Sequence, residues 1–142
     1  MQDRFRVRGW SIYDSGYYDD IQNMLFGEED NMTLLDAISK GLVSEIIPEQ
    51  CTGLKDKNGK LIYEGDIVEV TSPENWNIFD EYSNSEILGK GVVVTKPGCA
   101  FIKKNDIDGE EKEYYFVLYS VVEDADVEVV GNIHENPELL KE

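Results

Sequence analysis

The sequence predicts a mainly β protein, built as a bent antiparallel sheet or small barrel with one or two short peripheral helices. Three observations support this prediction. Leu, Ile, Val and Phe make up 40 of the 142 residues, far above the level of roughly 20% below which disorder is expected. Apolar and polar residues alternate in several short runs, which is typical of half-buried strands. Glycine-containing turn dipeptides separate these runs.

The chain has the length of one ordinary domain. We therefore expect a single domain over residues 1–142. Its N-terminal part, residues 1–52, should contain a strand followed by helix and loop, and residues 53–142 should be rich in strands.

The first strand is predicted near the N-terminus, where Arg4, Arg6 and Arg8 alternate with Phe5 and Val7. One interpretation is an edge strand whose arginines pair with nearby carboxylates. The alternative is an anion-binding patch made by the three arginines.

Residues 11–49 predict mostly loop and helix, with the best helix over residues 33–40. Asn31 or Thr33 can cap its start, and Gly41 suits its end. The helix is short, so we expect it to pack on a sheet.

The β-rich part begins with a hairpin. Asn58 and Gly59 favour a type I′ turn, because both tolerate positive φ. Residues 60–63 should then form a strand. Glu64 and Gly65 should reverse or bulge the chain before the next strand, at residues 66–70.

Further strands follow this hairpin. We expect one at residues 91–95, ended by the Lys-Pro-Gly sequence at 96–98, and another at 100–103. Asp108-Gly109 predicts a second hairpin turn. Residues 114–122 are apolar on both faces, which predicts a central strand, and residues 127–129 predict a more exposed one.

Two remaining segments are predicted to be irregular or helical. Residues 71–89 indicate a long loop with Trp76, Phe79 and Tyr82 as aromatic anchors. Near the end of the chain, Asn136 and Pro137 are typical of the cap and first turn of a short helix.

The charge balance is strongly acidic, with 13 Lys and Arg against 30 Asp and Glu and a net charge of -17. This balance opposes broad contact with phosphate backbones or anionic lipid. No apolar run approaches the roughly 18 residues of a membrane span, and the first residues lack a signal-peptide pattern. We therefore expect a soluble intracellular protein.

No catalytic or metal-binding pattern is visible in the sequence. Cys51 and Cys99 form no CxxC pair, and His134 is the single histidine. Such cysteines are most often small buried hydrophobes, and His134 is expected at the surface. Nucleophile-elbow and phosphate-loop motifs are absent. We therefore expect no cofactor, no metal and no enzymatic activity.

Three segments carry a resemblance to a known family. The sequence QCTGLKDKNGKLIYEGDIVEV, residues 50–70, closely resembles the signature of the YopX family. The opening FRVRGW, residues 5–10, and the closing VEVVGNIHENPELL, residues 127–140, are similar to the ends of that family. The opening departs at Gly9, where the family pattern has a small alanine-like residue.

The resemblance implies a mainly β, acidic protein of bacteriophages and prophages that acts in the bacterial cytoplasm. The family has no established molecular role and supplies no catalytic residues. The motif residues have structural interpretations as turn formers and a packing aromatic: Gly53, Asn58, Gly59, Tyr63, Gly65, Asp66 and Gly131.

Three hypotheses for function follow from the sequence. The first is a non-enzymatic phage accessory protein that binds a host or phage protein, as a homo-oligomer, with exposed aromatics such as Trp76. The second is a small barrel that binds single-stranded nucleic acid through Arg4, Arg6 and Arg8, with Trp10 as a stacking platform. The third is an acidic mimic of nucleic acid that occupies the basic groove of a DNA-binding protein.

Overall fold

The computed structural model describes residues 6–26, 32–72, 88–105 and 113–140. The protein is mainly β, as the sequence predicts, and the described residues include two short α-helices. The elements in chain order are β1 Val7–Ser11, β2 Gly16–Tyr18, α1 Leu34–Ser39, β3 Ile46–Lys55, β4 Leu61–Tyr63, β5 Asp66–Thr71, β6 Gly89–Lys96, β7 Cys99–Asn105, β8 Glu113–Val117, α2 Leu118–Asp124, β9 Asp126–Asn132 and the 3₁₀ helix η3 Pro137–Leu140.

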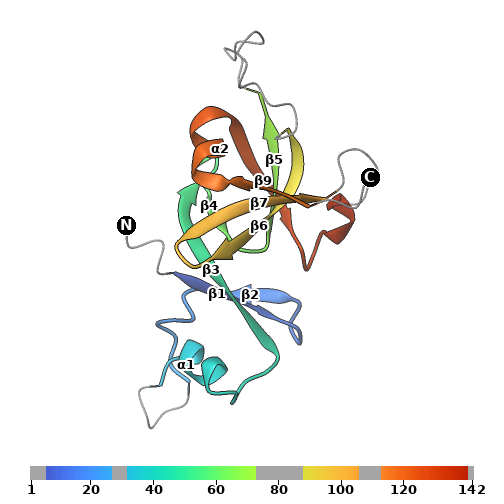
Figure 1. Cartoon of the computed structure of the whole chain (residues 1–142). Coiled ribbons are helices and arrows are strands. Elements are labelled where there is room, and N and C mark those ends of the chain that lie inside the picture. The colour runs from blue at the N-terminus through green and yellow to red at the C-terminus, as the bar shows by residue number, and fades with distance from the viewer. Residues whose placement is uncertain (1–5, 27–31, 73–87, 106–112, 141–142) are drawn as a thin grey trace.

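The strands form two antiparallel sheets. The N-terminal sheet has the order β2-β1-β3-β4, and the C-terminal sheet has the order β8-β7-β6-β5-β9. Figure 1 shows the C-terminal sheet curling around α2, with the N-terminal sheet beneath it and α1 at the far end. The curled sheet agrees with the prediction of a bent sheet or small barrel.

The hairpin between β3 and β4 extends the curl, because its loop docks on the outer edge of β9. Lys57 N donates to Val127 O at 2.8 Å, and Val129 N donates to the Asp56 carboxylate at 3.0 Å. The loop thus satisfies backbone groups that a free edge strand leaves unpaired.

The core lies inside the curled sheet, where β-branched residues of β5, β6 and β9 meet the buried side of α2. Its buried members are Ile62, Val68, Val70, Val93, Ile102, Leu118, Val121, Ala125 and Val127. Most of them come from strands that the Val- and Ile-rich runs predict.

The N-terminal sheet is larger than the sequence indicates. Residues 46–55 form the ten-residue strand β3, although residues 11–49 favour loop and helix. Pro48 and Gly53 interrupt the alternating pattern, so only pairing with β1 and β4 reveals the strand. β3 also runs across the boundary expected between residues 52 and 53.

The prediction that the first strand lies at an edge is wrong. β1 lies between β2 and β3, and it pairs with both. One face of the N-terminal sheet packs against Ile21 and α1, whose Leu34 and Ala37 are buried. A Cβ on Gly9 would lie 2.5 Å from Ile46 and 3.3 Å from Ile21, so this close packing requires glycine.

The prediction of a central strand over residues 114–122 is also wrong. β8 ends at Val117 and lies at an edge of the C-terminal sheet, and α2 follows at once. Leu118, Val121 and Ala125 are buried at helical spacing, i, i+3 and i+7. A short run that is apolar on both faces does not distinguish a buried strand from a buried helix.

Other local predictions are confirmed. α1 spans six of the eight predicted residues, and the Thr33 hydroxyl accepts a hydrogen bond from Asp36 N at 3.1 Å. The strands expected around residues 60–63, 66–70, 91–95, 100–103 and 127–129 correspond to β4, β5, β6, β7 and β9. The helix expected at Pro137 is a 3₁₀ helix.

The turn at Asn58-Gly59 exists, but its type differs from the predicted I′. Gly59 has φ of +82°, whereas Asn58 is not in the left-handed region. Gly59 N donates to Asp56 O, and the Asp56 carboxylate accepts from the backbone N–H groups of Asn58 and Lys60. This aspartate stabilises a longer loop, as in hairpins with a positive-φ glycine after the turn.

Some predictions fall outside the described residues. These are the opening residues with Arg4 and Phe5, the cap candidate Asn31, the turn at Asp108-Gly109, and most of the loop with Trp76, Phe79 and Tyr82.

Candidate functional site

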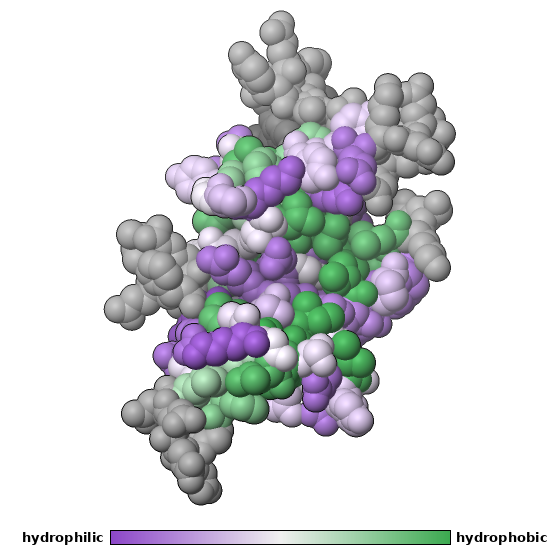
Figure 2. Space-filling view, turned by 60° about the horizontal axis from the view of Figure 1, so that its bottom comes forward, coloured by the Kyte–Doolittle hydropathy of each residue, from purple (hydrophilic) through white to green (hydrophobic). Residues whose placement is uncertain are grey.

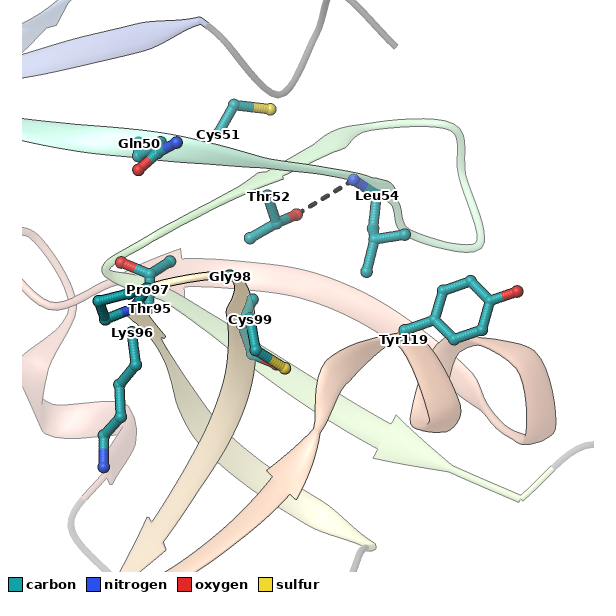
Figure 3. Close-up of a pocket in the computed structure, with 11 residues that line it drawn as sticks. Gln50, Cys51, Thr52, Leu54, Thr95, Lys96, Pro97, Gly98, Cys99 and Tyr119 are labelled. Carbon is teal, nitrogen blue, oxygen red and sulfur yellow. Dashed lines mark hydrogen bonds between the residues drawn. The ribbon is translucent and has the colours of Figure 1, made fainter.

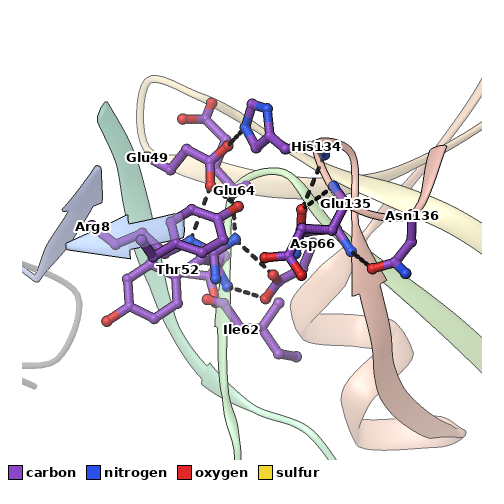
Figure 4. Close-up of polar contacts among 12 residues, drawn as sticks. Arg8, Glu49, Thr52, Ile62, Glu64, Asp66, His134, Glu135 and Asn136 are labelled. Carbon is purple, nitrogen blue, oxygen red and sulfur yellow. Dashed lines mark hydrogen bonds and ion pairs between the residues drawn. The ribbon is translucent and has the colours of Figure 1, made fainter. Parts of the chain in front are cut away.

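A cluster of charged and aromatic side chains joins the two sheets, with Arg8 of β1 at its centre. The Arg8 side chain is only 9% exposed. Its Nε donates to Glu49 Oε1 at 3.0 Å, and its Nη2 donates to Asp66 Oδ1 at 2.7 Å and to Glu64 O at 3.3 Å. Figure 4 shows these carboxylates converging on the guanidinium from β3 and β5. Arg8 therefore ties the N-terminal sheet to the first strand of the C-terminal sheet.

Two tyrosine rings cover the guanidinium of Arg8. Its Cζ lies 4.0 Å from the ring centroid of Tyr17 and 4.6 Å from that of Tyr63. Tyr17 is carried by β2 and Tyr63 by β4, so the whole N-terminal sheet contributes to the enclosure. Such cation–π contacts partly replace the water that burial removes from the cation.

Glu49 is the second centre of the cluster. Its Oε1 accepts from the Tyr17 hydroxyl at 2.9 Å as well as from Arg8, and its Oε2 lies 2.8 Å from His134 Nε2. The imidazole of His134 stacks on Trp10, with centroids 4.6 Å apart and an interplanar angle of 6°. His134 thus connects the segment after β9 to the face of the N-terminal sheet.

Burial and charge set the protonation of the cluster. Burial raises the pKa of Asp66, and Arg8 only partly offsets this effect. Burial also raises the pKa of the Tyr17 hydroxyl, with Glu49 adding to the rise and Arg8 opposing it. For Arg8, burial lowers the pKa, but its anionic partners outweigh burial and the pKa is raised. The guanidinium therefore stays charged and Tyr17 stays neutral.

The cluster is closed. Every buried side-chain nitrogen or oxygen in the described part of the chain has a hydrogen-bond partner. A general acid or base needs access to a substrate proton, and here Arg8, Tyr17 and Glu49 donate to or accept from one another. The arrangement therefore holds the sheets together and leaves no vacant position within it.

Of the three arginines in the alternative anion-binding patch, the structure describes Arg6 and Arg8, and Arg4 lies outside the described residues. Arg8 is buried in ion pairs, as the carboxylate-pairing interpretation predicts, and Trp10 is 8% exposed and already stacked on His134. The side chain of Arg6 is 48% exposed and lies 3.9 Å from Asp20. Arg8 and Trp10 are therefore unavailable to a nucleic acid.

The family-motif residues support this cluster. Gly65 has φ of +87°, and a Cβ there would lie 2.5 Å from Glu49 Oε2, so glycine is required twice over. Asp66 accepts from Tyr63 N at 2.8 Å as well as from Arg8. Its role is therefore more than the turn formation that the sequence suggests.

The remaining motif glycines have structural roles. Gly53 has φ of +81° at the irregularity in the pairing of β3 with β4. A Cβ on Gly131 would lie 2.6 Å from the Asn136 side chain. That side chain also accepts from Asn132 N, at 3.3 Å, and thereby closes the turn that carries His134.

A groove of about 710 Å³ lies between β3 and the hairpin of β6 and β7. Figure 3 shows β3 on one side, the β6–β7 turn on the other and Tyr119 of α2 at one end. Its lining residues are uncharged except for one lysine: Gln50, Cys51, Thr52, Leu54, Thr95, Lys96, Pro97, Gly98, Cys99, Ala100 and Tyr119. The volume of the groove lies within the roughly 300–1,000 Å³ of ligand sites.

An exposed apolar strip continues from the groove along the outer side of β7 and β8. Cys99 and Tyr119 are exposed groove residues, and Tyr115 and Val117 are 42% and 40% exposed. Phe101 pairs with Val117 across the strands and meets Tyr115 edge to face at 6.3 Å. On the face of the molecule drawn in Figure 2, apolar side chains likewise reach the surface between hydrophilic ones. We name these five residues the outer strip.

Sequence reasoning missed most of these positions. Glu49 and Tyr17 lie in a segment expected to be loop and helix, and His134, expected at the surface, is 14% exposed. Arg8 and Glu49 are 41 residues apart in the sequence, so no local pattern predicts that they form an ion pair. Cys51 is buried, as expected of a small hydrophobe, whereas Cys99 is exposed.

The described residues show neither a metal-binding cluster nor a membrane-spanning helix. No group of three or more His, Cys, Asp or Glu residues among them is placed to hold a metal ion. None of their helices combines the length and the apolar character needed to cross a bilayer.

Comparison with known proteins identifies the family. The chain is similar to a crystal structure of protein EF1440 from Enterococcus faecalis, with a TM-score of 0.56 and 22% identity over 96% of this chain and 97% of that one. This likeness supports the fold. No curated protein sequence matches the chain. The family model described as YopX protein matches residues 7–141. The chain therefore belongs to the YopX family.

Proposed function

We propose that this protein is a non-enzymatic phage or prophage accessory protein that binds a segment of another protein in the groove between β3 and the β6–β7 hairpin. The groove, continued by the outer strip, is the observation that carries the proposal. Exposed apolar surface next to a concave site is typical of protein interaction sites.

The contrast between the groove and the Arg8 cluster supports a binding role. The charged side chains that resemble catalytic groups are enclosed and paired with one another. The groove is open, and its walls combine apolar surface with Thr52 and Thr95, whose hydroxyls donate within the protein to Ile62 O and to Glu64 Oε2. Such a lining suits a peptide segment that binds mainly through apolar side-chain contacts.

Self-association and location are part of the proposal. β8 is an edge strand of the C-terminal sheet, and edge strands pair readily with another chain. We propose a homo-oligomer that acts in the bacterial cytoplasm. Light scattering should give a mass that is a multiple of 16.2 kDa, and a mass of 16.2 kDa at all concentrations would exclude self-association.

Affinity capture from bacterial host cells tests the groove. Cys99 is exposed, so Cys99→Trp should fill the groove without disturbing the core. Leu42→Trp is the matched control, because Leu42 is 60% exposed and follows α1, away from the groove. A partner quantified by mass spectrometry should be captured by the wild type and by Leu42→Trp, and at least tenfold less by Cys99→Trp.

The capture should be repeated at low and at high salt. Retention at high salt agrees with an apolar interface in the groove. A basic nucleic-acid-binding protein that Cys99→Trp captures equally well, and that high salt or DNA releases, would instead support the acidic mimic and reject the groove.

A further inference from the structure

The hairpin of β6 and β7 differs in charge from the rest of the chain. Residues 89–105 contain four lysines and no Asp or Glu, although acidic residues outnumber basic ones by 30 to 13 overall. This hairpin forms one wall of the groove and carries part of the outer strip. The proposed binding surface therefore lies on a locally basic segment of an acidic protein.

Three of these lysines already have partners. Lys90 Nζ lies 3.9 Å from Glu69, and Lys103 Nζ lies 3.1 Å from Glu113. Lys104 Nζ donates to Leu88 O. These contacts stabilise the sheet and neutralise part of its positive charge.

Lys96 is the exception. It is exposed, and it forms no ion pair with a carboxylate of the described residues. Its Nζ lies 4.8 Å from the ring centroid of Tyr115 and 6.0 Å from that of Phe101. Lys96 lines one end of the groove, and Figure 3 shows its side chain extending away from β3. The ammonium group of Lys96 therefore lies between the groove and the outer strip.

The contacts of the nearest carboxylate explain why no acidic side chain of the described residues pairs with Lys96. Glu113, on the neighbouring edge strand, accepts from Lys103 and from the Tyr115 hydroxyl at 3.0 Å. These contacts, with Lys96 adding to them, lower the pKa of Glu113. The Glu113 carboxylate already contacts Lys103 and Tyr115, so Lys96 is available to a carboxylate of a partner.

We infer that the partner segment carries an Asp or Glu that pairs with Lys96, next to apolar residues that cover Tyr115, Val117 and Tyr119. This inference rests on the proposed function and names the chemistry of its partner. A carboxylate beside the ring-bound ammonium gains a charge-assisted hydrogen bond, and the aromatic rings exclude water from it.

An acidic peptide fits better than a nucleic acid. A nucleic acid needs several cations along its backbone, whereas Lys96 is the one lysine of this hairpin without a contact to an oxygen of the described residues. A strand of several nucleotides would also extend past the hairpin onto the rest of a chain whose overall net charge is -17. One carboxylate, in contrast, responds mainly to charges within about 8 Å at physiological salt.

Selection from a displayed library of random dodecapeptides tests this inference, with the wild type, Lys96→Glu, Lys40→Glu and Cys99→Trp as targets. Lys40 is an exposed lysine at the end of α1, so Lys40→Glu changes the net charge equally without touching the groove. Peptides selected by the wild type and by Lys40→Glu should be enriched in Asp or Glu beside apolar residues. Lys96→Glu should bind those peptides at least about tenfold more weakly, which equals about 1.4 kcal/mol.

The outcomes separate the inference from the proposed function. The prediction of an acidic partner would be wrong if the selected peptides lack acidic enrichment or bind Lys96→Glu as tightly as the wild type. The groove would still be supported as the binding site if Cys99→Trp abolishes the binding of those peptides. Failure to enrich any peptide over the starting library would reject the groove itself. Binding of single-stranded DNA that depends on Lys96 would show a nucleic acid site and overturn the inference.

Discussion

At the scale of single residues, Arg8 and Glu49 decide how the two sheets are joined. Arg8 contacts carboxylates of β3 and β5, and Glu49 contacts Arg8, Tyr17 and His134. Without Arg8, Asp66 would lose its ion-pair partner, and Glu49 would keep only its contacts with Tyr17 and His134. The cluster therefore provides specificity for one relative placement of the sheets.

Replacing Arg8 by Met should destabilise the protein by about 3–5 kcal/mol, because Glu49 and Asp66 lose their buried partner. Urea unfolding measures this loss. Arg6→Met is the matched control, since the Arg6 side chain is 48% exposed and a surface ion pair contributes about 1 kcal/mol at most. Equal effects of the two substitutions would show that Arg8 is not part of a buried cluster.

The pKa of Tyr17 predicts a loss of stability at alkaline pH. Burial raises this pKa above its ordinary value of 10.0, so the unfolded chain ionises first as the pH rises. The contribution of Tyr17 is complete below pH 10 and is lost as the pH rises through the folded-state pKa. Near pH 11 the free energy of unfolding should fall by up to about 1.4 kcal/mol per pH unit from this group.

Urea unfolding between about pH 8 and pH 11 measures this slope, and Tyr17→Phe should reduce it. Tyr13→Phe is the control, because Tyr13 is 85% exposed, and it should leave the slope unchanged. A slope that survives in Tyr17→Phe would assign the alkaline effect to other groups.

At the scale of elements, α2 is the clearest departure from the pattern of the sequence. It lies directly after β8 and fills the curled sheet, with Leu118 and Val121 buried and Ser120 exposed. A strand would place Leu118 and Ser120 on the same face, so substitutions at these two positions distinguish the two conformations.

Leu118→Ala should destabilise the protein by about 2–5 kcal/mol, since Leu118 is fully buried. Ser120→Ala should change stability by at most about 0.5 kcal/mol, or raise it slightly, because alanine favours an exposed helix position. Thermal unfolding of both variants tests this prediction. A comparable loss in Ser120→Ala would argue for a strand at this position.

At the scale of the whole molecule, the net charge of -17 opposes compaction. The repulsion acts mainly between exposed carboxylates, whereas the Arg8 pairs are buried and respond little to salt. Salt should therefore raise the stability of the folded protein if repulsion between exposed carboxylates dominates, and lower it if attraction within surface ion pairs dominates.

Raising NaCl from about 0.01 M to 0.15 M should raise Tm by about 4 °C, as the screening length falls from about 30 Å to 8 Å. Calorimetry measures the shift. Glu123→Lys with Asp124→Lys replaces two exposed acids at the end of α2 and should make the salt effect smaller. A decrease of Tm with salt would show that attractive surface ion pairs outweigh the repulsion.

The sequence by itself determined the family, the β class and most of the C-terminal strands. These properties rest on local signals: the Val- and Ile-rich alternation of β5, β6 and β9, the glycines at turns, and the Thr33 cap of α1. Hydrogen-bond geometry and periodicity act over a few residues, so a linear pattern reports them well.

Only the tertiary structure decided where the charged and apolar surfaces lie. Arg8 looks like an exposed strand residue until Glu49 and Asp66 approach it from 41 and 58 residues away. The helix α2, the strand β3 and the groove beside Lys96 likewise depend on which segments meet. Long-range contacts determine burial, and burial decides whether a given arginine joins two sheets or a given lysine remains available for a partner.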